Sequence, residues 1–177
     1  MSVRDEPQSC ACGFEASTVS TANAERLLRD LASRYEAALS TEDAAGLIDG
    51  RLRRRPSPDT WSALEYACHV RDVIALWGWA LHHTLNETFP QLPAVEADLP
   101  DRVAAENDYN GQDPAAVTSQ LSANAERMAG KVATMRPEQW GRSARFGDVD
   151  IDPLWIVRKV AHEGHHHLGD IQRCLEP

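Results

Sequence analysis

The chain has 177 residues and a hydrophobic fraction of 42%, enough to build one domain with a buried core. Its formal net charge of -9 argues against a nucleic-acid-binding protein, which needs a basic surface to neutralise phosphates. No stretch approaches the roughly 18 apolar residues of a membrane helix, and the first residues lack the apolar segment of a secretory signal. We therefore expect a cytoplasmic protein without membrane contact.

The first half of the chain contains two segments with the apolar spacing of amphipathic helices. The first spans residues 21–45, although two glycines at and just beyond its end weaken it. A basic run at residues 51–55 is followed by a turn rich in proline, and we interpret the run as a solvated helix end. Trp61 and Ser62 then open a second helix, which we expect to reach about residue 86.

A long connection with three prolines separates this helix from the second half of the chain, with a short helix expected near residues 101–107. Asp113 followed by Pro114 is typical of a helix start, because the acid caps free amide groups and proline fits the first turn. The third long helix should end near residue 135. Residues 141–152 lack helical periodicity and suit a short hairpin or an extended loop, and Pro153 opens a last helix that runs to about residue 175.

These elements predict an all-α fold, a four-helix bundle with a long crossover between its second and third helices. We assign residues 1–20 to a flexible N-terminal segment and residues 21–177 to the bundle. Cys10 and Cys12 form a C-x-C pair rather than the C-x-x-C spacing typical of structural zinc, so we place them in a loosely docked tail. A second metal site at this pair is the alternative, and the role of the two cysteines stays open.

Histidines are concentrated on two of the predicted helices. His69 falls on the apolar face of the second helix. On the last helix, Glu163 and His167 lie within or at the edge of the apolar face, whereas His162 and His166 point away from it.

Residues four apart stack on one helix face and can reach one ion, so Glu163, His167 and His69 would supply one carboxylate and two imidazoles. Three protein ligands with room for a further ligand is the pattern of catalytic sites, whereas structural zinc is closed by four. Asp170, one turn beyond, could accept a hydrogen bond from His167. Two alternatives stay open, namely a merely solvated polar helix face and a metal register that uses His162 and His166.

His162 and His166 also bracket an H-E-x-x-H sequence, the zinc motif of a class of peptidases. In those enzymes both histidines bind the ion and the glutamate acts as base. Here the two histidines would face away from the core, and a bundle offers no sheet edge beside which a peptide could lie. We therefore do not favour a peptidase.

Three sequence stretches resemble the DinB-like superfamily, which includes bacillithiol S-transferases and mycothiol-dependent maleylpyruvate isomerase. They are W-S-A-L-E-Y-A-C-H-V-R-D at residues 61–72, E-N-D-Y-N-G-Q-D-P at residues 106–114 and E-G-H-H-H-L-G-D-I at residues 163–171. The resemblance implies zinc, or alternatively nickel, held by the second-helix histidine and an i,i+4 pair of the last helix. Two pairs are compatible with that pattern: Glu163 with His167, and His162 with His166. Aligning residues 167–171 with the family pattern favours Glu163 with His167.

The resemblance also implies a thiol-dependent S-transferase or isomerase in which a divalent ion deprotonates a low-molecular-weight thiol such as mycothiol. The thiolate would attack an electrophilic small molecule. The alternatives are a hydrolase or lyase that uses bound hydroxide, and a stress-related metal-binding protein without catalytic activity. A homodimer is a possible assembly. The electrophile, the thiol and the native metal are not specified by the sequence.

Overall fold

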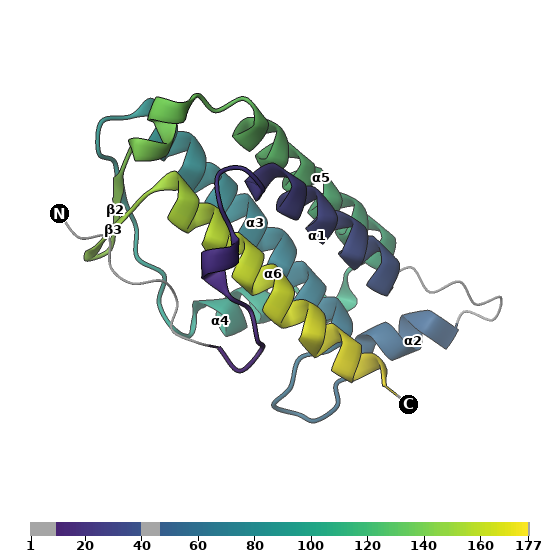
Figure 1. Cartoon of the computed structure of the whole chain (residues 1–177). Coiled ribbons are helices and arrows are strands. Elements are labelled where there is room, and N and C mark those ends of the chain that lie inside the picture. The colour runs from purple at the N-terminus through teal and green to yellow at the C-terminus, as the bar shows by residue number, and fades with distance from the viewer. Residues whose placement is uncertain (1–9, 40–46, 177) are drawn as a thin grey trace.

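The computed structural model describes residues 10–39 and 47–176 of the chain. Within them, four long helices lie side by side as a bundle: α1 (Ala24–Leu39), α3 (Ala63–Asn86), α5 (Pro114–Ala133) and α6 (Pro153–Leu175) (Figure 1). Helix α1 packs against α5 and α6, and α3 packs against the same two helices from the opposite side. The predicted all-α four-helix bundle is therefore confirmed.

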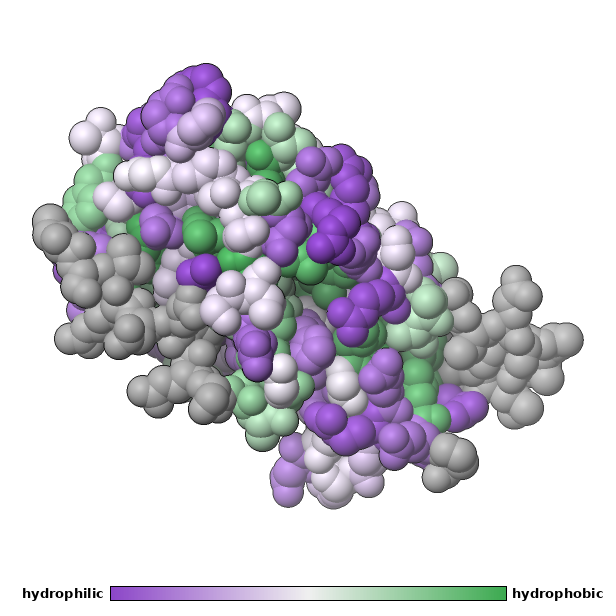
Figure 2. All heavy atoms as spheres, viewed as in Figure 1, coloured by the Kyte–Doolittle hydropathy of each residue, from purple (hydrophilic) through white to green (hydrophobic). Residues whose placement is uncertain are grey.

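The core is built from the apolar face of each long helix. Leu28 and Tyr35 of α1, Ile74 of α3, Leu121 of α5 and Ile156 of α6 are all fully buried. Burial of apolar surface of this kind contributes about 25 cal/mol per Å² and holds the four helices together. Hydrophilic residues cover much of the face seen in Figure 2, and hydrophobic residues show mainly in the gaps between them. Among the described residues, no helix is both long and apolar enough to span a bilayer.

The long crossover between α3 and α5 contains β1 (Gln91–Leu92), α4 (Leu99–Glu106) and the short 3-10 helix η2 (Tyr109–Gly111). The expected short helix near residues 101–107 is thus α4, which begins two residues earlier. After α5, the 3-10 helix η3 (Pro137–Gly141) leads into a hairpin of β2 (Ala144–Phe146) and β3 (Val149–Ile151). Of the two conformations considered for residues 141–152, the hairpin is the one observed.

The hairpin turns at Gly147, whose φ of 57° lies in the left-handed region that glycine adopts without strain. Strand β1 adds to β2 in parallel, with Gln91 opposite Arg145 and Leu92 opposite Phe146. This pairing was not predicted, because a strand of two residues has no periodicity to detect. It ties the crossover to the hairpin at one end of the bundle.

The first helix differs from its predicted range of residues 21–45. Residues 21–23 form a turn, so α1 starts at Ala24, and its described part ends at Leu39; residues 40–46 lie outside the described residues. A separate short helix, α2 (Leu47–Arg53), was not predicted. Its last turn carries Arg51 and Arg53, so the basic run does lie at a helix end.

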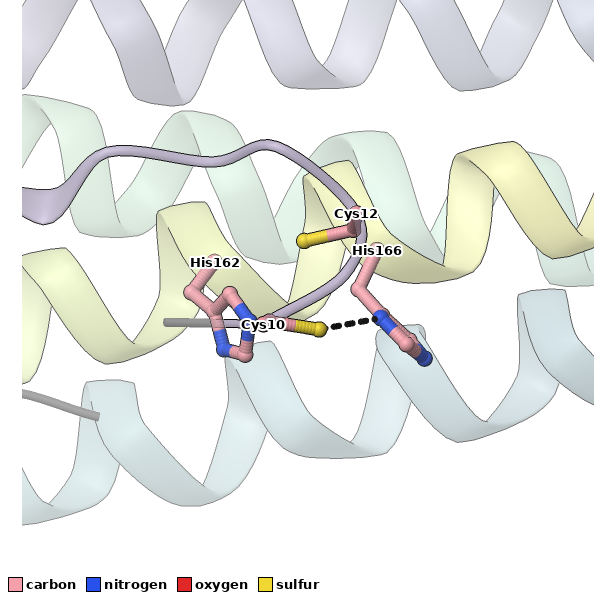
Figure 3. Close-up of side chains that lie close together, drawn as sticks. All are labelled: Cys10, Cys12, His162 and His166. Atoms are coloured by element: carbon pink, nitrogen blue, oxygen red, sulfur yellow. Dashed lines mark hydrogen bonds between the residues drawn. The ribbon is translucent and has the colours of Figure 1, made fainter. Parts of the chain in front are cut away.

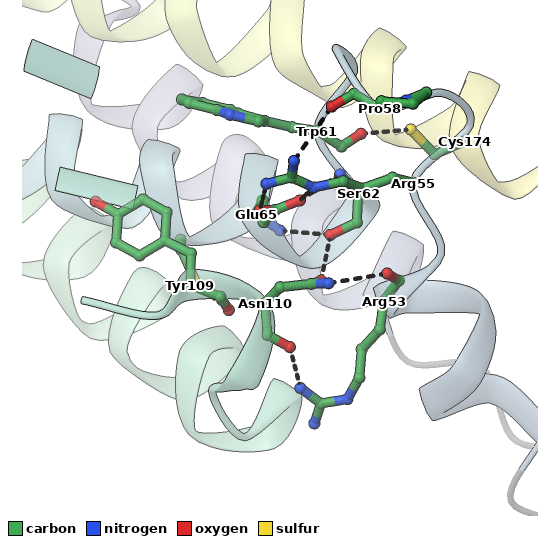
Figure 4. A network of polar contacts seen from close by, with 10 residues as sticks. Arg53, Arg55, Pro58, Trp61, Ser62, Glu65, Tyr109, Asn110 and Cys174 are labelled. Atoms are coloured by element: carbon green, nitrogen blue, oxygen red, sulfur yellow. Dashed lines mark hydrogen bonds and ion pairs between the residues drawn. The ribbon is translucent and has the colours of Figure 1, made fainter. Parts of the chain in front are cut away.

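A polar network fixes the start of α3 against the rest of the molecule (Figure 4). The Ser62 hydroxyl accepts a hydrogen bond from the Glu65 amide at 3.2 Å, and the Glu65 carboxylate accepts one from the Ser62 amide at 2.8 Å. Arg55 donates to both carboxylate oxygens of Glu65, and Ser62 donates to Asn110 at 2.7 Å. Burial alone would raise the pKa of Glu65, but Arg55 and Ser62 outweigh it and lower that pKa. The position of His69, one turn further along α3, is thereby set.

Residues 10–20 cross the outside of α6 (Figure 1) and include the 3-10 helix η1 (Ala16–Thr18). Val19 is buried, and its carbonyl accepts hydrogen bonds from the guanidinium of Arg158 at 3.0 and 3.1 Å. Residues 1–9 lie outside the described residues. The division into a flexible segment at residues 1–20 and a bundle at residues 21–177 stays a prediction.

Candidate metal centre

The structure brings His69 of α3 together with Glu163 and His167 of α6. The Glu163 Oε2 atom lies 3.7 Å from His69 Nε2 and 3.5 Å from His167 Nε2. One ligand atom from each of the three residues lies within 4.8 Å of the others. The pair on α6 faces α3 because residues four apart share one helix face, and the apolar residues around them direct this face inward.

The spacing of these three atoms fits a zinc-sized ion. A tetrahedral ion with bonds of about 2.0–2.2 Å holds its ligand atoms roughly 3.3–3.6 Å apart. The two distances to the Glu163 oxygen are close to this range and longer than typical hydrogen bonds. Two imidazole nitrogens and a carboxylate oxygen are also donors that zinc and nickel accept.

The orientation of His167 is held from behind by Asp170. The Asp170 Oδ2 atom accepts a hydrogen bond from His167 Nδ1 at 2.8 Å, which leaves Nε2 free to face the cluster. Asp170 also accepts from Arg173, and the ring of Tyr66 stacks on the imidazole of His167 with centroids 5.3 Å apart. Asp170 thus occupies the supporting position considered for it from the sequence.

Lys159 balances the charge of the Glu163 carboxylate. Its ammonium group donates to Glu163 Oε1 at 2.6 Å, so the second oxygen, Oε2, remains directed at the two histidines. Burial by itself would raise the pKa of Glu163, but the imidazoles of His167 and His69 and the ammonium of Lys159 hold it well below its ordinary value. Glu163 is therefore ionised, as a metal ligand must be.

The other pair on α6, His162 and His166, lies elsewhere. No group of neighbouring metal-binding side chains in the described residues combines this pair with His69. Instead, His162 and His166 lie beside Cys10 and Cys12 of the N-terminal segment. The H-E-x-x-H arrangement of a peptidase is likewise not formed, because Glu163 faces His69 and His167.

A cavity of about 570 Å³ opens beside the cluster, and both His69 and Glu163 form part of its wall. The other walls are mainly apolar and come from α3, the crossover, the hairpin and the start of α6; they include Val73, Leu76, Trp77, Val95, Pro100, Phe146, Val149 and Trp155. The Trp77 ring packs against both Phe146 and Trp155, with centroids 5.0 and 5.3 Å apart.

The sequence alone did not identify the crossover and hairpin residues as part of this cavity. Val95, Phe146 and Val149 lie in segments without helical periodicity, and their place beside α3 depends on how the crossover and the hairpin pack in three dimensions. The available signal was the large apolar side chains of Trp77 and Trp155, which indicate burial but do not show which space they line.

A family model for the DinB superfamily matches residues 33–171. The chain belongs to the DinB superfamily. Helix α3, most of α6 and the candidate ligands His69, Glu163 and His167 lie inside the matched region. No curated protein matches the sequence significantly.

Two solved structures share the fold of this DinB-superfamily chain at low sequence identity. YfiT from Bacillus subtilis, described as a probable metal-dependent hydrolase with an unusual four-helix bundle topology, superposes with a TM-score of 0.75 and 15% identity, covering 96% of this chain and 91% of that one. A mycothiol-dependent maleylpyruvate isomerase superposes with a TM-score of 0.61 and 14% identity, covering 92% of this chain and 68% of that one. Both similarities establish the fold.

Replacing Asp170 with asparagine is expected to weaken zinc binding at the three-residue cluster by about 10- to 100-fold, because His167 loses the carboxylate that orients it. Competition with a chromophoric chelator measures this affinity. Asp30→Asn is the matched control, since the contact of Asp30 among the described residues is an exposed ion pair with Arg26, and its replacement should leave the affinity unchanged. Equal affinity in Asp170→Asn and wild type would contradict the supporting role.

Proposed function

We propose that this protein is a metal-dependent enzyme that joins a low-molecular-weight thiol, with mycothiol as the expected one, to an electrophilic small molecule, or isomerises that molecule through reversible thiol addition. The observation that supports this most directly is the shared position of His69 and Glu163. They belong both to the three-residue cluster and to the wall of an apolar cavity. An ion at the cluster would therefore face a space that a small apolar substrate can fill.

The ligand set favours a catalytic site over a structural one. His69, Glu163 and His167 provide three ligands, so a tetrahedral ion keeps one position for a non-protein ligand. When bound, a zinc or nickel ion supplies a positive charge that lowers the pKa of a thiol near it. The apolar cavity walls reduce the water around the reacting sulfur and so strengthen electrostatic interactions there.

The chain does not place a thiol of its own at this cluster, as far as the described cysteines show. Cys68 and Cys174 are buried, and burial raises the pKa of both, to about 12 for Cys68. Cys10 and Cys12 lie beside His162 and His166 instead. A thiol-dependent reaction at His69 and Glu163 would therefore draw its sulfur from a cosubstrate, and we expect it in the cytoplasm, where such thiols are kept reduced.

Lys159 is the polar group best placed to handle the substrate. It lines the cavity and donates to Glu163 Oε1. Its ammonium group has three donor hydrogens, so it can also bind a carboxylate or carbonyl oxygen of a molecule in the cavity. A substrate with an apolar body and one such oxygen, carrying an electrophilic carbon, suits these walls.

A second candidate is a hydrolase that uses metal-bound hydroxide, since YfiT is described as a probable metal-dependent hydrolase. Thiol dependence separates the two readings. The test compares zinc-loaded and chelator-treated protein, each incubated with a haloaromatic electrophile and mycothiol, bacillithiol, glutathione or no thiol. A parallel sample contains an activated ester without thiol.

Thiol consumption that requires both the protein and its metal, and that is fastest with one thiol, is the expected result. Ester hydrolysis without any thiol would replace the proposal with the hydrolase. A stoichiometric ion at His69, Glu163 and His167 with neither activity would favour a metal-binding protein that is not an enzyme.

A further inference from the structure

A second cluster of metal-binding side chains lies on the outer side of α6. Cys10 and Cys12 of the N-terminal segment face His162 and His166 of the helix (Figure 3), and one ligand atom from each of the four lies within 4.8 Å of the others. Cys10 Sγ is 3.2 Å from His166 Nδ1, and the two imidazole rings have centroids 5.9 Å apart. None of these residues belongs to the site described above.

His162 lacks any hydrogen-bond partner inside the described structure. Both of its ring nitrogens are inaccessible to solvent and neither makes a hydrogen bond; the nearest acidic group is Glu163 Oε1, 3.9 Å from Nδ1. Leaving a buried polar group unsatisfied is costly, and most such groups in folded proteins have a partner. A metal ion in the cluster would supply the missing partner.

The remaining contacts of the cluster are those expected around bound zinc. His166 directs Nδ1 at Cys10 and has its other nitrogen, Nε2, 3.4 Å from Asp170 Oδ2. A carboxylate behind the outer nitrogen is the common support of a zinc-bound histidine. His165 Nε2 lies 3.1 Å from the Cys12 carbonyl, and the Phe14 ring packs against both His162 and His165. The N-terminal segment is thus held against α6 at Cys12 and at Phe14 as well as at Cys10.

We propose that Cys10, Cys12, His162 and His166 form a closed zinc site that fastens the N-terminal segment to α6. Two thiolates and two imidazoles complete a tetrahedral shell, which is the composition of structural zinc. The two thiolate charges neutralise those of the ion. A tetrahedral zinc with bonds of about 2.3 Å to sulfur and 2.0–2.1 Å to nitrogen needs ligand atoms roughly 3.3–3.8 Å apart, so small side-chain rotations close the cluster.

The site would join residues near the start of the sequence to its last helix. Because the four ligands come together only in the folded chain, binding of the ion is expected to stabilise the fold as well as order residues 10–14. Asp170 contacts His166 of this site and His167 of the first cluster. The two sites are therefore neighbours that share one supporting carboxylate.

Cobalt substitution distinguishes the two sites in the full-length protein, because only the second one contains thiolates. Under reducing conditions, cobalt added to the metal-free wild-type protein should produce the intense near-ultraviolet absorption of thiolate-bound cobalt, and zinc should abolish it. The Cys10→Ser/Cys12→Ser variant should lose this absorption and one zinc per chain. The Glu163→Ala variant should keep the absorption and lose the other zinc.

Cys174→Ala is the matched control for a lost cysteine, since Cys174 lies away from the cluster, and it should retain the absorption and both ions. Limited proteolysis should cut the wild-type N-terminal segment only after zinc is removed. Absence of thiolate-to-cobalt absorption in the wild-type protein would overturn the proposal without reference to any variant. Failure of the proposed enzyme function would appear separately, as loss of thiol transfer while this absorption persists.

Discussion

Replacing His69 with alanine is expected to abolish metal binding at the three-residue cluster and to reduce thiol transfer by about 100-fold or more. His69 is the only one of the three candidate ligands on α3, so Glu163 and His167 would be left as two ligands on one helix. Removing a residue that supports a metal ligand typically lowers metal affinity or activity by about 10- to 100-fold. Removing a ligand itself should lower them at least as much. Zinc content and the rate of thiol consumption measure the two effects.

The matched control is His82→Ala, which removes an exposed histidine further along α3 that contacts only Asn86 in the hydrogen bonds observed. The zinc content of this variant and its rate of thiol consumption should equal those of the wild-type protein. The His69→Ala variant should also keep the cobalt–thiolate absorption of the Cys10 and Cys12 site, which shows that the chain is folded. Undiminished thiol transfer in His69→Ala would rule out the three-residue cluster as the catalytic centre.

The elements with strong local signals were predictable from sequence. Asp113 caps α5 through a hydrogen bond to the Ala115 amide at 3.0 Å, and the bundle follows from helices with one apolar face. Helical periodicity also placed Glu163 and His167 on the inner face of α6 and His162 and His166 outside it, as the structure has them. Whether Glu163 and His167 bind a metal remains a prediction.

The parts that could not be predicted depend on contacts between distant residues. Phe146 and Val149 line the cavity from the hairpin, whose strand β2 pairs with β1 of the crossover and whose Phe146 packs on Trp77 of α3. From the sequence alone, His162 and His166 fit a solvated helix face. Only the structure shows Cys10 and Cys12 against them, because no local pattern indicates that a non-helical segment crosses α6. Whether Cys10 and Cys12 bind a metal, the alternative left open from their C-x-C spacing, remains a prediction.

Gly164, between Glu163 and His167, sets how closely α1 approaches α6. A Cβ atom at this position would lie 2.5 Å from both terminal carbons of Leu31, a buried side chain of α1. The Gly164 carbonyl also accepts a hydrogen bond from the buried Tyr35 hydroxyl at 3.0 Å. Glycine normally costs a helix about 1 kcal/mol relative to alanine, so its presence here reflects the need for close packing.

Replacing Gly164 with alanine is therefore expected to lower the free energy of unfolding by about 1–2 kcal/mol. Overpacking a core costs roughly 1–3 kcal/mol, which exceeds the gain of up to about 1 kcal/mol in helix propensity. Urea denaturation of the zinc-saturated protein should show a lower midpoint with an unchanged slope.

Gly169→Ala on the same helix is the control, and it should change the free energy of unfolding in the opposite direction. Its Cβ atom would meet only the end of the exposed Arg173 side chain, at 3.4 Å, which can move aside. The propensity gain should then dominate and raise stability by roughly 0.5–1 kcal/mol. In a Leu31→Ala background, where the obstructing side chain is gone, Gly164→Ala should also become neutral or stabilising. Destabilisation of equal size in both backgrounds would mean that Leu31 is not the reason for glycine at this position.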